Sequence, residues 1–189
     1  MDPEGFNDFS TVQEAAREGL REGRFVEGSG PLAWRFVELP SFGDAVAWDV
    51  RMGAGRRDAD APRLVRSRWC RARDAREFGS PVERLRRLGR PRPFLPTIEA
   101  ETHPVDPAWV SAFLQRLRSV PIPLAIARPR IGLDGTTYEL IVGDAFCRSR
   151  IAWWCSLPDE WAGLGPILDE MLAVFESIRR GPAPSDEEV

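Results

Sequence analysis

The side chains best suited to metal or proton chemistry lie in one short segment, which contains the only histidine of the chain. Glu99, Glu101 and His103 alternate along residues 97–103, and alternate side chains of a β-strand project from the same face. Two carboxylates beside an imidazole could hold a divalent cation or relay protons. A solvated polar face is the more common arrangement. A metal-dependent enzyme is therefore an alternative hypothesis, and we assign no metal ligand and no cofactor.

Motifs whose spacing implies a reaction are absent from the sequence. It contains no glycine-rich phosphate loop, nucleophile elbow, HExxH or paired CxxC. Cys70, Cys147 and Cys155 are an odd number without metal-ligand spacing, so we expect free thiols in a reducing compartment. The sequence therefore predicts a protein without catalytic residues.

Arginine is concentrated in the middle of the chain. All 26 basic residues are arginine, and residues 56–92 hold 13 of them against five acidic residues. A helix expected over residues 81–90 would turn Val82, Leu85 and Leu88 inward. A site for an anionic partner would then combine the exposed arginines of this helix with two from the preceding strand: Arg66, Arg68, Arg84, Arg86, Arg87 and Arg90.

Three interpretations of this basic region remain open: a solvated face, a site for an acidic protein, and a nucleic-acid site. The overall charge of −3 and the scarcity of aromatic residues among the arginines count against nucleic acid. Nucleic-acid binding is therefore kept as an alternative function for residues 56–92.

Adjacent tryptophans define a second candidate surface. Trp153 and Trp154 must point to opposite faces if residues 146–155 form a strand. Trp153 lies on the apolar face, whereas the other face carries Phe146, Arg148, Arg150 and Trp154. Because tryptophan and arginine often dominate interface energies, we hypothesise that these four residues bind a protein. The alternative is that a packed layer, for example a helix over residues 106–119, covers them.

The elements that must position these residues follow from hydrophobic periodicity and capping residues. We expect helices over residues 10–22, 81–90 and 106–119, and strands over residues 32–39, 44–52, 64–72 and 97–103. A helix is the alternative for residues 64–72. In the last third, Asp134-Gly135 predicts a hairpin between strands 124–133 and 136–142, followed by strand 146–155. A helix after Asp159 carries an apolar stripe from Leu164 to Ile178.

This order predicts an α+β fold with one or two antiparallel sheets covered by helices. It comprises two three-stranded meanders, each followed by a helix, which could be a degenerate βββα duplication. We expect a flexible N-terminus over residues 1–9, one domain over 10–180 with subdomains 32–91 and 94–180 as a further division, and a disordered acidic tail over 181–189. The start of the sequence lacks the pattern of a signal peptide, and no run of residues is long and apolar enough for a membrane span, which predicts a cytoplasmic protein.

In size, acidity, tryptophan content and lack of catalytic motifs, the chain is similar to immunity proteins of bacterial toxin systems and to accessory subunits of larger assemblies. This similarity implies a non-enzymatic bacterial protein whose partner is another protein. The sequence does not indicate which protein that is.

Overall fold

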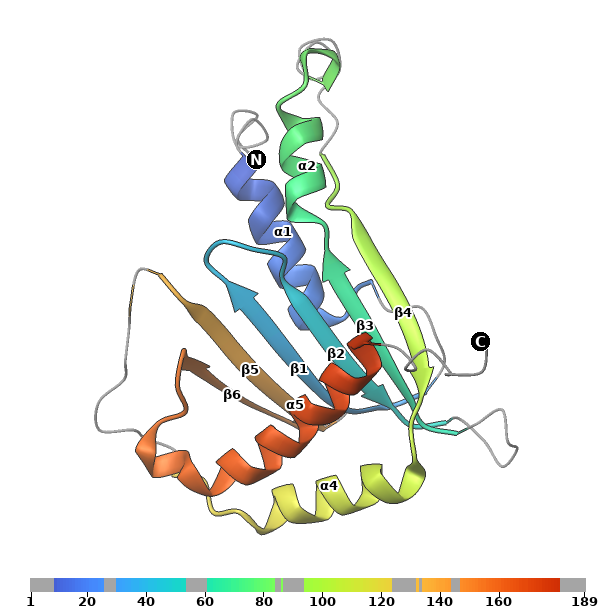
Figure 1. Ribbon diagram of the computed structural model, residues 1–189, viewed down its shortest axis with the longest axis vertical. Coiled ribbons are helices and arrows are strands. Elements are labelled where there is room, and N and C mark those ends of the chain that lie inside the picture. Colours follow the sequence, from blue (N-terminus) through green and yellow to red (C-terminus); the bar gives the residue numbers. More distant parts are fainter. Residues whose placement is uncertain are drawn as a thin grey trace, which may run out of the picture.

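The strands form one antiparallel sheet in the order β4-β3-β2-β1-β5-β6 (Figure 1). The computed structural model describes residues 9–25, 30–53, 61–83, 86, 94–123, 132, 134–143 and 147–180. The strands are β1 (Leu32–Pro40), β2 (Val46–Arg51), β3 (Arg63–Trp69), β4 (Ile98–Pro104), β5 (Thr136–Gly143) and β6 (Arg148–Trp154). The α+β prediction is confirmed, and both expected subdomains contribute strands to this sheet.

The larger hydrophobic core lies between the sheet and two helices, α4 (Pro107–Ser119) and α5 (Gly165–Arg180) (Figure 1). The 3-10 helix η3 (Asp159–Leu164) directly precedes α5. Alternate strand residues face these helices: the ring of Trp34 stacks on Phe113 of α4, and the rings of Phe36 and Trp48 contact Phe175 of α5. Asp106 caps α4, because its carboxylate accepts a hydrogen bond from the Ala108 amide at 2.8 Å. The expected helices in both regions are confirmed.

The opposite face of the sheet is covered by α1 (Phe9–Glu22), which lies behind the strands in Figure 1. Val12, Ala16 and Leu20 recur every four residues and form its buried stripe. They pack against sheet residues that include Val37 and Ile141. The fold therefore has three layers, with the sheet between α1 on one side and α4 and α5 on the other.

Charged side chains are buried beneath α1. Arg35 of β1 forms two hydrogen bonds with Asp49 of β2, of which the Nη2 to Oδ2 bond is 2.6 Å, and both side chains are almost completely buried. Glu139 of β5 accepts hydrogen bonds from Arg21 of α1 at 2.8 Å and from Arg150 of β6 at 2.9 Å. Arg35 Nη1 also donates a hydrogen bond to the Arg21 carbonyl at 2.6 Å. Arg21 thus ties α1 directly to β1 and β5, and the buried Arg35 and Glu139 each have an oppositely charged partner.

A helix that the sequence did not predict follows β3. The expected strand over residues 64–72 ends at Trp69, and α2 (Arg71–Phe78) begins two residues later. Its one buried residue, Asp74, accepts hydrogen bonds from Trp69 Nε1 at 2.7 Å and from the Thr97 amide at 2.8 Å. Because the inward side chain is polar, α2 lacks the apolar stripe by which helices are recognised.

The predicted C-terminal meander is corrected by the position of β5. One edge of β5 pairs with β1 and the other with β6, so no edge is left for a hairpin with residues 124–133. Gly135 lies at the end of β1 instead, where its carbonyl accepts a hydrogen bond from the Ser41 amide at 2.8 Å. The β5–β6 part of the meander is confirmed.

Several predictions fall wholly or mainly outside the described residues. They concern the flexible N-terminus, the acidic tail, the strand over 124–133 and most of the helix over 81–90. The domain limits and the duplication remain predictions.

Candidate functional site

An open hollow of about 370 Å³ lies where the C-terminal half of α5 crosses β1, β2 and β3. We call it the Trp48 hollow. Its lining combines four apolar and four charged side chains: Val46, Trp48, Leu172, Phe175, Glu38, Arg66, Glu176 and Arg179. A concave surface with an apolar floor and a few charged groups is typical of a binding site.

Strand register brings the sheet residues of the hollow together. Trp48 is the cross-strand partner of Phe36 on one side and of Arg66 on the other, and Glu38 is the partner of Val46. All these side chains belong to the face that α5 covers. Towards the C-terminal end of α5, the side chains between helix and sheet change from apolar to charged, and the closed core gives way to the hollow.

Trp48 forms the floor of the hollow and contacts both helix and sheet. Its ring stacks on Phe175 of α5, with centroids 4.5 Å apart and planes at 10°. The guanidinium carbon of Arg66 lies 5.4 Å from the centroid of the Trp48 ring, a distance at which the cation is attracted to the aromatic face. Two neighbours thus hold the indole in one orientation.

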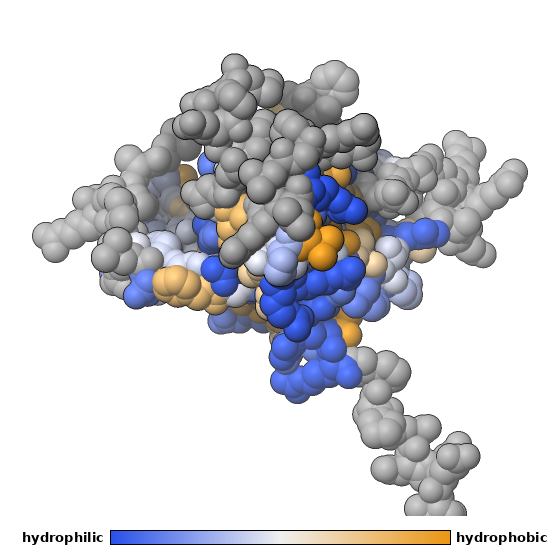
Figure 2. Space-filling model, turned by 90° about the horizontal axis from the view of Figure 1, so that it is seen from above, coloured by the Kyte–Doolittle hydropathy of each residue, from blue (hydrophilic) through white to orange (hydrophobic). Residues whose placement is uncertain are grey.

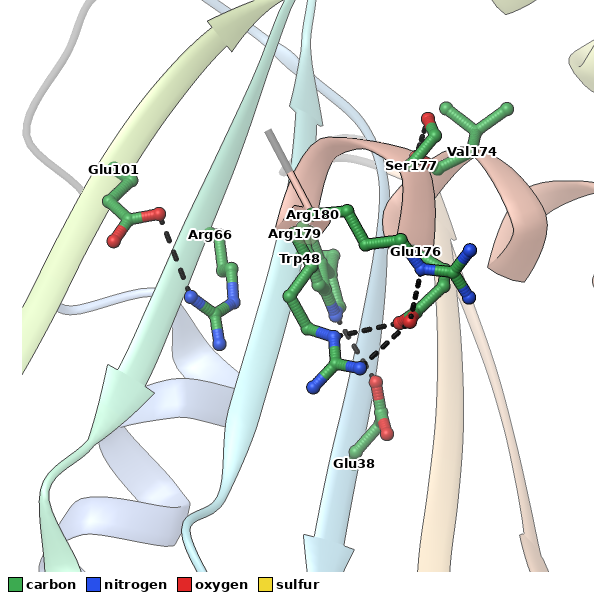
Figure 3. A network of polar contacts seen from close by, with 9 residues as sticks. All are labelled: Glu38, Trp48, Arg66, Glu101, Val174, Glu176, Ser177, Arg179 and Arg180. Atoms are coloured by element: carbon green, nitrogen blue, oxygen red, sulfur yellow. Dashed lines mark hydrogen bonds and ion pairs between the residues drawn. The ribbon is translucent and has the colours of Figure 1, made fainter. Parts of the chain in front are cut away.

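Glu38 is the most deeply placed acidic group in the hollow. The indole N–H of Trp48 donates a hydrogen bond to Glu38 Oε1 at 3.2 Å (Figure 3). Burial raises the pKa of Glu38, while the hydrogen bond from Trp48 and the charges of Arg66 and Arg179 act in the opposite direction. Desolvation has the larger effect, so the ionised carboxylate is under-compensated by its surroundings.

The rim of the hollow on α5 is charged and exposed. Glu176 accepts two hydrogen bonds from Arg179, each of 2.7 Å, and one from Arg180 at 3.1 Å (Figure 3). The hydrogen bonds from Arg179 lower the pKa of Glu176 to about 2. Ser177 turns away and donates to the Val174 carbonyl within the helix. The α5 side of the hollow therefore presents an exposed ion pair.

The arginines predicted to form one basic site have different surroundings in the structure. Arg66 lines the Trp48 hollow and lies 3.6 Å from Glu101, whereas Arg68 pairs with Glu99 at 2.5 Å and lies 3.7 Å from Asp44. Arg86 is exposed and lies 3.4 Å from Glu83. Arg84, Arg87 and Arg90 lie outside the described residues.

The inward face predicted for the helix over 81–90 is wrong at Val82. The Ser80 hydroxyl accepts a hydrogen bond from the Glu83 amide at 3.2 Å, as the capping pattern predicts. Val82, however, is 73% exposed, and Glu83 is the buried residue of this turn. An inward carboxylate replaces the expected apolar contact. Seen from above, the described surface carries hydrophilic and hydrophobic residues side by side (Figure 2).

The four residues predicted to form a surface on β6 differ in their surroundings. Arg148 and Arg150 are both exposed, and Arg150 also forms an ion pair with Glu139. Trp154 is half-buried, and a Cβ atom built on Gly132 or Gly135 would lie within 3 Å of its ring, so these glycines pack on the indole. Phe146 lies outside the described residues. The helix given as an example of a covering layer is wrong, because α4 packs on the opposite face of the sheet, with Trp153.

The possible metal cluster on β4 is engaged in ion pairs. Glu99, Glu101 and His103 share a face, as predicted, but both carboxylates pair with arginines of β3. His103 Nε2 lies 3.7 Å from Glu101. Among the described residues, no group of three potential ligands could hold a metal ion.

Sequence reasoning missed Glu38, Trp48 and Arg179 as members of one site. One signal was available: the alternation Trp34, Phe36, Glu38 places a carboxylate where the pattern calls for an apolar residue. The contribution of α5 carried no such signal, because it depends on where the helix crosses the sheet.

The described part of the chain contains no helix with both the length and the apolar character needed to cross a membrane. Comparison of the chain with protein-family models, with curated proteins and with solved structures finds no match.

Proposed function

We propose that this chain is a non-enzymatic protein-binding module whose binding surface is centred on the Trp48 hollow. The observation that carries the proposal is the composition of the hollow, in which a rigid aromatic floor is surrounded by charges of both signs. Protein interfaces favour tryptophan and arginine at their centres. In the cell we propose a cytoplasmic immunity-type protein or an accessory subunit of a larger bacterial assembly.

The charge pattern supports a protein partner over nucleic acid. Arg66 and Arg68 lie opposite Glu101 and Glu99 in the pairing of β3 with β4. A nucleic-acid backbone approaching these arginines would meet two carboxylates at the same time, which opposes polyanion binding. A protein surface can present complementary charges of both signs to such a pattern.

Leu172 provides a direct way to test the proposal. It lines the hollow and is 37% exposed, so an arginine at this position can be solvated while its side chain fills the hollow. Leu95 is 75% exposed and does not line the hollow, so Leu95→Arg is a matched control.

Tagged wild-type protein, Leu172→Arg and Leu95→Arg would be used for affinity capture from the native host, followed by mass spectrometry. We expect one protein to be captured by the wild type and by Leu95→Arg and to be lost with Leu172→Arg. Thermal unfolding of each variant checks that it folds. Capture of the same proteins by all three forms would refute the assignment to the Trp48 hollow.

A further inference from the structure

The charges of the Trp48 hollow are unevenly paired. Arg66 forms an ion pair with the carboxylate of Glu101, and Arg179 forms one with that of Glu176. No described residue forms an ion pair within 4 Å of Glu38, whose hydrogen-bond donor is the neutral indole of Trp48. Glu38 is therefore the charged group of the hollow that lacks an oppositely charged neighbour in contact.

Glu38 is also oriented for an incoming ligand. The indole N–H of Trp48 donates a hydrogen bond to Oε1 of Glu38, and no described residue donates one to Oε2. The carboxylate lies on the wall of an open hollow of about 370 Å³ rather than in the closed core. A donor that enters the hollow can thus reach Glu38 without displacing the Trp48 contact.

We propose that the hollow binds an arginine side chain of the partner protein, with its guanidinium paired to Glu38. This inference rests on the proposed function and names the group that the hollow recognises. The aliphatic part of an arginine can pack on Leu172, which is 37% exposed, and its planar head supplies several donors to the carboxylate.

The energetics favour this ligand because part of its cost is already met in the free protein. Glu38 is partly buried between the sheet and α5 before the partner arrives, and this burial raises its pKa. Pairing a carboxylate that is already desolvated with a cation avoids the carboxylate's share of the desolvation penalty that opposes buried ion pairs. Arg66 and Arg179 remain bound to their own carboxylates and oppose the incoming charge less than free cations would.

The test uses a small probe, so it does not depend on identifying the partner. Nα-acetyl-L-arginine methylamide is titrated into ¹⁵N-labelled protein while the indole N–H resonance of Trp48, assigned with Trp48→Phe, is followed by NMR. Nα-acetyl-L-citrulline methylamide, which has nearly the same shape without the charge, is the matched control. We expect a saturable shift with the arginine probe and at least about tenfold weaker binding of citrulline.

Glu38→Gln retains an oxygen for the Trp48 hydrogen bond and removes the charge, so it should weaken arginine binding to the level of citrulline. Leu172→Arg should block the probe with Glu38 intact. Absence of a saturable shift, equal binding of both probes, or unchanged binding in Glu38→Gln would overturn the inference. Failure of the probe together with Leu172-dependent partner capture would refute this inference alone, whereas probe binding with Leu172-independent capture would refute the proposed function.

Discussion

The indole N–H of Trp48 donates to Glu38 Oε1 across 3.2 Å, at the boundary between the larger core and the Trp48 hollow. This contact joins the wall of the hollow to its floor. It leaves the Glu38 carboxylate inside the protein surface without a cation in contact among the described residues. Both the stability of the protein and its recognition properties should therefore depend on the charge of Glu38.

Glu38→Gln should increase stability at neutral pH. Because the folded-state pKa of Glu38 is raised, the ionised carboxylate lowers the free energy of unfolding at pH values above that pKa, and this cost disappears below the unfolded value of about 4.3. The variant should be more stable than the wild type at about pH 7, with the difference shrinking towards about pH 3. Urea unfolding at several pH values measures this difference. Glu101→Gln, at an exposed carboxylate paired with Arg66, is the control, and a wild type that is more stable than Glu38→Gln at neutral pH would contradict the interpretation.

Asp49→Ala should be strongly destabilising because it leaves Arg35 buried without its carboxylate. Removal of one partner of a buried pair typically costs about 3–5 kcal/mol of unfolding free energy. The double variant Arg35→Met, Asp49→Ala should lose less than the sum of the two single variants. Chemical unfolding of the four proteins gives the coupling energy, and additive losses would show that the two side chains act independently.

Gly23→Ala should also be destabilising. Gly23 has a φ of +70°, and a Cβ atom at this position would lie 1.8 Å from Nη2 of Arg35. The backbone strain alone costs about 1–2 kcal/mol, and displacement of the guanidinium disturbs its bonds to Asp49. Gly165→Ala is the matched control, because a Cβ atom there meets no atom within 4 Å. Equal unfolding midpoints for the two variants would contradict the packing of Arg35 against Gly23.

Asp74→Ala should loosen the junction of β3, α2 and β4. It removes the acceptor for both Trp69 Nε1 and the Thr97 amide, and each buried donor left unsatisfied costs about 1–3 kcal/mol. The exposed residue Glu77 on the same helix provides the control Glu77→Ala, which should change stability by less than about 0.5 kcal/mol. Thermal unfolding compares them. If both variants melt together, Asp74 does not anchor this junction.

The parts of the fold that the sequence predicted are those with a local pattern. The alternation in β2 places Trp48 and Val50 on one face and Ala47 and Asp49 on the other, as the structure shows. Asp106 likewise marks the start of α4. Such signals depend only on neighbouring residues.

The parts that were missed depend on contacts between distant segments. Arg35 and Asp49 are 14 residues apart, and nothing near either residue indicates that they pair. The hairpin residues Asp134-Gly135 suggested a local partner for β5, but β1, about a hundred residues earlier in the chain, occupies that edge. The candidate site belongs to this second class, because it combines β1, β2 and β3 with the end of α5.

The most direct test of the central claim is the Kd of the captured partner for purified wild-type, Leu172→Arg and Leu95→Arg proteins, measured by isothermal titration calorimetry. A central interface residue contributes about 2 kcal/mol or more, so Leu172→Arg should weaken binding at least about 30-fold, whereas Leu95→Arg should leave it within about threefold. Equal Kd values for the two folded variants would contradict the claim that the Trp48 hollow is the binding site.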